Sequence, residues 1–119
     1  MGAGATGGTT RRGRLRIGIA VVRGASMEPT LRGGDRLLVL HGLAPRVGDV
    51  VAARFADGTD VVKRIAERRA DRWWLLSDAP DVGVDSRHRG AVPDADVRAV
   101  VLARLWPGPR WLRRRRGGL

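Results

Sequence analysis

The chain has 119 residues, of which 43% are hydrophobic, and these values fit one folded domain with a modest core. The absence of cysteine excludes disulfides, thiolate metal sites and a cysteine nucleophile, while two histidines, His41 and His88, are too few for a histidine-rich metal site. The net charge of +11 is concentrated in arginine-rich chain ends, a pattern typical of solvated tails, although such ends also permit weak contact with an anionic membrane or a nucleic acid.

The first predicted strand follows a glycine- and threonine-rich segment, residues 1–13, which we expect to be a disordered leader. From residue 14, apolar residues alternate with polar or small ones, and the apolar members are Leu15, Ile17, Ile19 and Val21. This period of two predicts a strand with one buried face. Its apolar run is much shorter than the roughly 18 residues that cross a bilayer, and it is too short for a secretory signal core. We therefore expect no integral membrane segment and a cytoplasmic location.

The rest of the chain is predicted to alternate short strands with turns. Around Glu28 to Leu31 we expect a loop with one short helical turn. Further strands are predicted by β-rich runs between turn residues, at 36–41, 50–55, 60–68, 72–77 and 96–106, although the length of the last run also permits a helix. The turn sequence ADGT joins two of these runs into a hairpin, and residues 78–90 form a long polar loop. In the pair Trp73 and Trp74, the first is expected in the core.

About six short strands with tight turns and little helix predict an all-β domain, either a coiled antiparallel sheet or a small barrel. We expect this domain to span residues 14–106. A basic tail with four consecutive arginines is expected at residues 107–119.

Lys63 is the one lysine in a chain that carries 22 arginines. A lysine can lose its proton when it is desolvated, whereas an arginine effectively cannot. Alternation along its strand places Lys63 on the same face as the apolar side chains of Val61 and Ile65, where poor hydration lowers the pKa of an amine. The pattern indicates a candidate general base; the alternative is a lysine that extends past apolar neighbours to water.

Ser26 is the candidate nucleophile among three serines. It follows Gly24 and Ala25 at the end of the first strand, where small residues allow close approach of another backbone. A serine at a strand-to-turn junction is exposed, and backbone N–H groups there can bind an oxyanion. The alternative is that Ser26 caps the turn that contains Glu28 and Thr30.

Four segments in order resemble the motifs of the signal peptidase I family of serine–lysine proteases. They are GASMEPTLRGGDRLLV (24–39), VGDVV (47–51), VKRI (62–65) and SDAPDVGVDSRHRG (77–90). The resemblance implies the fold of the signal peptidase I catalytic core, with Ser26 as nucleophile, Lys63 as general base and no metal or organic cofactor. It also implies a nucleophile motif and a supporting loop, whose residues are Gly24, Ala25, Met27 and Pro29, and Asp78, Asp85, Ser86 and Arg87, respectively.

Three positions depart from the family's pattern. The usual Gly-Asp-Asn opening of the last motif is Ser77-Asp78-Ala79 here. The serine that commonly orients the lysine falls at Gly83, so another group or water must hold Lys63. The hydroxyl that many relatives offer to the oxyanion falls at Gly24, which leaves the backbone N–H of Ser26 as the main donor.

Within the family, the chain is most similar to the soluble branch of nickel-type superoxide dismutase maturation proteases. This similarity implies an endopeptidase that removes an N-terminal propeptide from a protein substrate, the nickel superoxide dismutase precursor. One alternative is an anchorless signal peptidase relative that cleaves signal peptides at a membrane surface. Another is a non-catalytic basic β module that binds nucleic acid, although the few aromatic residues disfavour base stacking.

Overall fold

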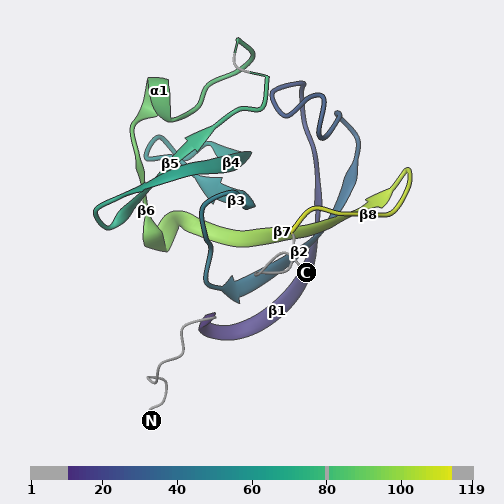
Figure 1. The fold of residues 1–119 in the computed structure, drawn as a ribbon, viewed down its shortest axis with the longest axis horizontal. Helices are drawn as coiled ribbons and strands as arrows, with labels where there is room; N and C mark the ends of the chain where they lie inside the picture. The colour runs from purple at the N-terminus through teal and green to yellow at the C-terminus, as the bar shows by residue number, and fades with distance from the viewer. Residues whose placement is uncertain (1–10, 80, 114–119) are drawn as a thin grey trace.

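A computed structural model describes residues 11–79 and 81–113, with side chains from residue 14 onward. The chain in this part folds into one eight-stranded sheet with two short helical segments (Figure 1). The strands are β1 (Arg11–Val21), β2 (Arg36–Leu43), β3 (Val50–Arg54), β4 (Asp60–Arg69), β5 (Arg72–Leu76), β6 (Val92–Pro93), β7 (Val97–Trp106) and β8 (Arg110–Trp111). The helical segments are α1 (Ser86–Arg89) and the 3₁₀ turn η2 (Asp94–Asp96). The predicted all-β class with little helix is confirmed.

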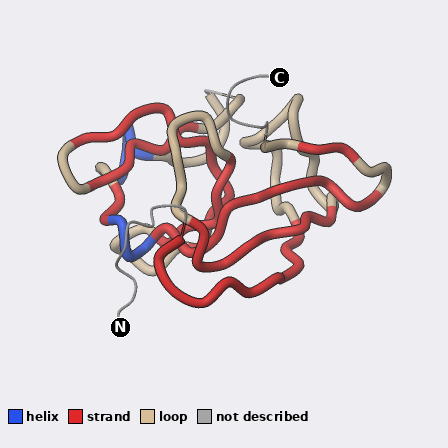
Figure 2. Tube along the Cα trace, turned by 60° about the horizontal axis from the view of Figure 1, so that its bottom comes forward, coloured by secondary structure: helices blue, strands red, loops and turns tan. Residues whose placement is uncertain are grey.

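The sheet runs in the order β1-β2-β7-β3-β4-β5-β6, with β8 paired to β7, and every pair is antiparallel. Figure 2 shows how the strands bend along an open, coiled sheet. The predicted hairpin is present as β3 and β4, closed by a 2.9 Å hydrogen bond from Phe55 N–H to the Thr59 carbonyl. The last long strand, β7, lies between β2 and β3 and thereby joins the two halves of the sheet.

Each face of the coiled sheet contributes to a hydrophobic cluster. The first cluster packs the β3–β4–β5 side and contains Val51, Ile65, Trp73 and Leu75, all at most 4% exposed. The second packs the β1–β2 side and contains residues of the segment between these strands, notably Met27 and Leu31. Because the second cluster buries Met27 and Leu31 almost completely, it fixes the turn in which Ser26 lies.

Strand β1 is confirmed, but the prediction that its alternating apolar residues face the core is wrong. Ile17, Ile19 and Val21 are 73%, 61% and 51% exposed. The opposite face of the strand lies against the sheet: a side chain at Gly18 would come within 3.1 Å of the imidazole of His41. β1 is the terminal strand of the sheet, so alternation correctly predicts its conformation but not which of its faces is covered.

The two short strands that the sequence did not predict, β6 and β8, have two residues each. β8 lies within the segment expected as a basic tail and pairs with β7, and Arg113 donates a 3.0 Å hydrogen bond to Asp49. β1 likewise begins at Arg11, within the segment expected as a leader. Residues 1–10 and 114–119, most of the expected leader and about half of the expected tail, lie outside the described residues.

The adjacent tryptophans behave as expected from their positions on β5. Trp73 is 4% exposed and its indole N–H donates to Asp94 at 2.8 Å. Trp74 is only partly buried, and the Arg69 guanidinium stacks 3.7 Å from its ring centroid. Among residues 11–79 and 81–113, neither helical segment has the length or the apolar composition needed to traverse a bilayer.

Candidate active site

The turn that carries Ser26 begins where β1 ends. Gly24 has a φ of 75°, a conformation that residues with a side chain rarely adopt, and this glycine sets the direction of the turn. The N–H of Glu28 then donates to the Ala25 carbonyl at 3.1 Å, and Ser26 itself remains partly exposed. A side chain at Gly24 would enter open space, so the backbone conformation, rather than crowding, disfavours a side chain at this position.

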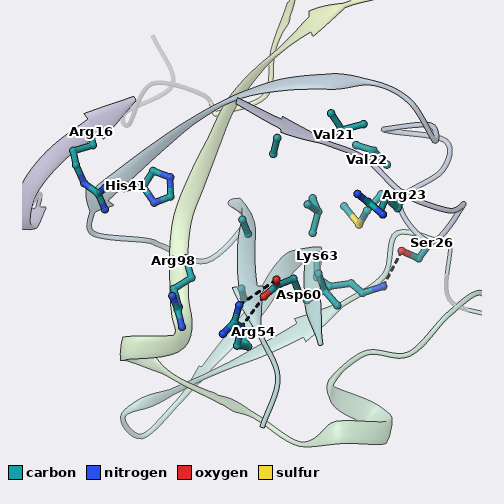
Figure 3. Close-up of a pocket in the computed structure, with 16 residues that line it drawn as sticks. Arg16, Val21, Val22, Arg23, Ser26, His41, Arg54, Asp60, Lys63 and Arg98 are labelled. Atoms are coloured by element: carbon teal, nitrogen blue, oxygen red, sulfur yellow. Dashed lines mark hydrogen bonds and ion pairs between the residues drawn. The ribbon is translucent and has the colours of Figure 1, made fainter. Parts of the chain in front are cut away.

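Lys63 reaches Ser26 from β4 (Figure 3). Its side chain is on the buried side of the strand, the residue is 4% exposed, and its amine donates to Ser26 Oγ at 2.7 Å. A second hydrogen bond, 3.0 Å long, joins the amine to Ser77 Oγ. Burial lowers the pKa of Lys63, while the nearby carboxylate of Asp85 acts to raise it. The structure therefore holds the amine at proton-transfer distance from a serine hydroxyl.

Side chains of the supporting loop accept hydrogen bonds from backbone N–H groups at the end of β5. Ser86 Oγ accepts the Leu75 N–H at 2.9 Å, and Asp85 Oδ2 accepts the Ser77 N–H at 2.9 Å. Asp85 also caps α1 and receives an ion pair from Arg87 at 2.8 Å. These contacts fix Ser77, and through it the loop is connected to the amine of Lys63.

Asp85 is a fully buried carboxylate, and its hydrogen-bond and ion-pair partners determine its pKa. Burial acts to raise its pKa, but the side chain of Arg87 and the backbone N–H groups of Ser77 and Arg87 donate to it. Together these donors lower the pKa of Asp85 from 3.8 to about 2. The carboxylate is therefore ionised at all but strongly acidic pH.

Asp78 ties the nucleophile turn to β4. It accepts two hydrogen bonds from Arg64, both 2.9 Å long, and one from the hydroxyl of Thr30 at 2.5 Å. Burial acts to raise the pKa of Asp78, but these donors lower it. The neighbouring Ala79 N–H donates to the carbonyl of Ser26 at 2.8 Å. The loop thus holds the turn that carries Ser26 in two ways: the Asp78 side chain binds Thr30, and the Ala79 backbone binds Ser26 itself.

The structure brings most of the predicted site residues together, with different roles. Met27 is buried in the core and anchors the turn, whereas Pro29 is exposed to solvent. Ser77, Arg64 and Thr30 were not among the site residues predicted from the sequence. All three lie within the motifs described above, and the serine at the head of the last motif, in place of glycine, was the available signal for Ser77.

A cleft of about 770 Å³ extends from Ser26 and Lys63. Its walls come from the end of β1 on one side and from the β3–β4 hairpin on the other, including Val61 and Val62. Figure 3 shows the far end, where charged and polar side chains gather. These residues are Arg16, His41, Arg54, Asp60 and Arg98. Such a cleft can hold an extended peptide against a strand edge. Within the described residues, no group of His, Asp or Glu side chains could hold a metal ion.

Comparison with known proteins identifies the family of the chain. Residues 10–91 match the model of the family described as Peptidase S24-like, which covers both Ser26 and Lys63. The chain belongs to the Peptidase S24-like family. Among curated relatives, this Peptidase S24-like chain is similar to the mitochondrial inner membrane protease subunit 1 of Schizosaccharomyces pombe. The alignment of the two sequences is 120 residues long with 33% identity, and it covers 79% of this chain and 76% of the relative.

A second relative extends the similarity to another lineage. The mitochondrial inner membrane protease subunit 1 of Xenopus tropicalis is 29% identical over 115 residues, covering 75% of this Peptidase S24-like chain and 69% of the relative. Both relatives belong to the signal peptidase I-like family of proteases. Family and relatives together identify the protein as a protease that acts on a protein substrate.

Proposed function

We propose that the protein is a serine endopeptidase in which Ser26 is the nucleophile and Lys63 the general base. The observation that carries this proposal is the 2.7 Å contact between the buried amine and Ser26 Oγ. The pKa of Lys63, lowered by burial, supports a population of neutral amine that can accept the serine proton. No other lysine is available in the sequence for this role.

The reaction proceeds through an acyl-enzyme. Neutral Lys63 takes the proton from Ser26 Oγ as this oxygen bonds to the scissile carbonyl carbon, and the backbone N–H of Ser26 stabilises the oxyanion. The peptide C–N bond then breaks, and Lys63 returns the proton to the leaving amine. Neutral Lys63 then takes a proton from water as the water oxygen bonds to the ester carbon, the ester C–O bond breaks, and Lys63 passes the proton to Ser26 Oγ, which restores both groups.

The substrate proposed is the N-terminal propeptide region of a precursor protein, with the nickel superoxide dismutase precursor as the specific candidate in the cytoplasm. Support comes from the resemblance of the motifs to that branch of the family, including the glycine at position 83. The open cleft beside the edge strand β1 supports binding of an extended segment of chain.

Incubation of the purified protein with the nickel superoxide dismutase precursor tests both parts of this proposal. The wild type is expected to release the propeptide, and Ser26→Ala and Lys63→Ala are each expected to lose several powers of ten in rate, because the pair acts as a unit. Mass spectrometry of the products gives the cleavage site. An uncleaved precursor would exclude this substrate. Cleavage that survives both substitutions would exclude the dyad.

A second candidate, cleavage of signal peptides at a membrane surface, is favoured by exposed apolar side chains. These are Ile17 and Ile19 on β1, and Trp106 and Trp111, which are 58% and 75% exposed. Single large apolar residues are normal on a protein surface, but several on one molecule can also contact lipid.

Co-sedimentation with anionic vesicles at physiological salt separates the two candidates. The cytoplasmic proposal predicts that the wild type stays in the supernatant and that vesicles do not change its rate. Pelleting that the double substitution Ile17→Ser and Ile19→Ser reduces would favour the membrane candidate. Pelleting that the substitutions leave unchanged would place the lipid contact elsewhere and would still contradict the cytoplasmic proposal.

A further inference from the structure

We propose that Ser77 is the positioning residue for the general base: its hydroxyl accepts a hydrogen bond from Lys63 and thereby aims the amine at Ser26. This inference rests on the dyad proposed above and assigns a role to a residue that the sequence motifs do not identify. It begins from the two hydrogen bonds of the amine, 2.7 Å to Ser26 Oγ and 3.0 Å to Ser77 Oγ.

The chemistry of a neutral amine explains why a second hydroxyl is useful. A neutral amine has two N–H donors and one lone pair, and only the lone pair can accept the proton of the nucleophile. When Ser77 Oγ accepts one N–H, rotation about the Cε–Nζ bond is restricted and the lone pair can face Ser26 Oγ. In this arrangement Ser77 binds the general base but neither gives nor takes the transferred proton; it acts through Lys63.

Ser77 can do this because its own position is fixed. It is 8% exposed, and its backbone N–H is bound to Asp85 at 2.9 Å. Asp85 is in turn held by Arg87 and fully buried. The chain of contacts Arg87, Asp85, Ser77, Lys63, Ser26 therefore connects the ion pair on the loop to the nucleophile.

In this chain the backbone at position 83, where many relatives have the orienting serine, disfavours a side chain. Gly83 has a φ of 73°, which disfavours any side chain, and its backbone packs against the dyad. An added Cβ would lie 3.3 Å from the Cβ of Ser26 and 3.6 Å from Nζ of Lys63. A serine there would strain the backbone and press on the nucleophile, whereas Ser77 approaches the amine from the end of β5.

Asp85 is the charged group that acts on the titration of the amine, and other charged groups lie on the neighbouring elements. Asp85 with Arg87, and Asp78 with Arg64, belong to the loop and to β4. Arg23 lines the cleft near Ser26. Substitution of Ser77 by alanine changes none of these charges. A shift in the titration of Lys63 in that variant therefore reports the loss of the hydroxyl.

The single lysine makes the titration directly observable. Protein labelled with ¹³C-lysine gives one side-chain Cε signal, from Lys63, whose shift with pH follows its protonation without any substrate. In Ser77→Ala the midpoint is expected to move to lower pH, because the ammonium form loses a hydrogen-bond acceptor. Ser77→Thr, which keeps the hydroxyl, is expected to restore the wild-type midpoint.

Ser86→Ala is the matched control. Ser86 is a buried serine on the same loop whose hydroxyl accepts a backbone N–H and does not reach Lys63. It is expected to lower the melting temperature and to leave the lysine midpoint unchanged. In peptidase assays at a pH above both lysine midpoints, where the amine is neutral in either protein, Ser77→Ala is expected to lower kcat by about tenfold to a hundredfold, with KM changed less than twofold, because misaligned groups slow the chemical step.

Either of two titration results would overturn the inference. One is a Ser77→Ala variant with the wild-type lysine midpoint, and the other is a pair of Ser77→Ala and Ser86→Ala variants that shift the midpoint equally. Gly83→Ser in the Ser77→Ala background is expected not to restore kcat, and full restoration would also contradict it. If the wild type shows no Ser26-dependent cleavage, the proposed function fails, while the lysine titration still decides whether Ser77 holds the amine.

Discussion

Replacing Lys63 with arginine is expected to reduce peptidase activity at neutral pH by on the order of 10⁴-fold or more, although the positive charge is retained. A guanidinium does not lose its proton in the accessible pH range, so it cannot take the proton of Ser26. The loss should match that of Lys63→Ala, because either change removes the base from a pair that acts as a unit. Initial rates on a fluorogenic peptide or on a cleaved precursor measure the effect.

Arg72→Lys is the matched control for this substitution. It exchanges the same two side chains at an exposed position on β5 and should leave the rate within about twofold of wild type. A Lys63→Arg variant with substantial activity would show that a group other than the amine activates Ser26.

The pH dependence of the wild type follows from the same residue. Because the neutral amine is the active form, kcat should rise with increasing pH and level off above the pKa of Lys63. Burial lowers that pKa from its ordinary value of 10.5, although Asp85 opposes the shift, so the rise should be centred below pH 10.5. Lys63→Arg should show no such rise.

Substitution of Asp85 by alanine is expected to cause the largest loss of stability among single changes in the loop, about 2–4 kcal/mol. The change removes the N-cap of α1, usually worth about 1 kcal/mol, and leaves the buried Ser77 N–H without its acceptor, at a cost of about 1–3 kcal/mol. For a domain of this size the melting temperature should fall by roughly 10–20 °C. Urea unfolding and thermal denaturation at pH 7 measure both quantities.

Asp85→Asn and Asp71→Ala serve as comparisons. Asparagine retains an oxygen acceptor and is a good N-cap, so it should cost less than alanine. Asp71 lies exposed in the turn between β4 and β5, and its loss should change stability by no more than about 0.5 kcal/mol. An Asp85→Ala variant as stable as Asp71→Ala would mean that the contacts of Asp85 contribute little to the fold.

The stability contributed by the charge of Asp85 should disappear in acid. Its pKa in the folded protein, about 2, is below the ordinary 3.8, so the unfolded chain binds a proton more readily than the folded one in this range. The contribution is therefore complete above about pH 4 and is lost as the pH falls through about 2. The stability difference between wild type and Asp85→Asn should narrow over the same interval.

The sequence predicts the strand pattern well, because alternation and turn residues are local signals. It identifies Lys63 because one lysine among 22 arginines is conspicuous, and Ser26 because it follows two small residues at a strand end. It fails for the exposed face of β1, because which face is covered depends on a long-range pairing order that places this strand at the edge of the sheet. The two-residue strands β6 and β8 are too short for any periodic signal.

The sequence also does not predict the proposed role of Ser77, for a different reason. The serine in place of glycine at the head of the last motif marks Ser77 as unusual, but it does not reveal that the hydroxyl lies 3.0 Å from the amine of Lys63. That contact depends on where the carboxylate of Asp85 holds the backbone of Ser77 after folding. Sequence motifs identify residues that recur at fixed positions, and they miss a group that serves the same purpose from a new position.

The place of β7 between β2 and β3 has a consequence for how the candidate site assembles. Ser26 follows β1, and Lys63 lies on β4, 37 residues later. Among the described residues, the half of the sheet that contains β1 and β2 pairs with the half that contains β3 and β4 through β7, which follows the other long strands in the chain. A chain shortened before residue 97 lacks the strand that joins these halves, so we expect it not to hold the Lys63 amine against the Ser26 hydroxyl.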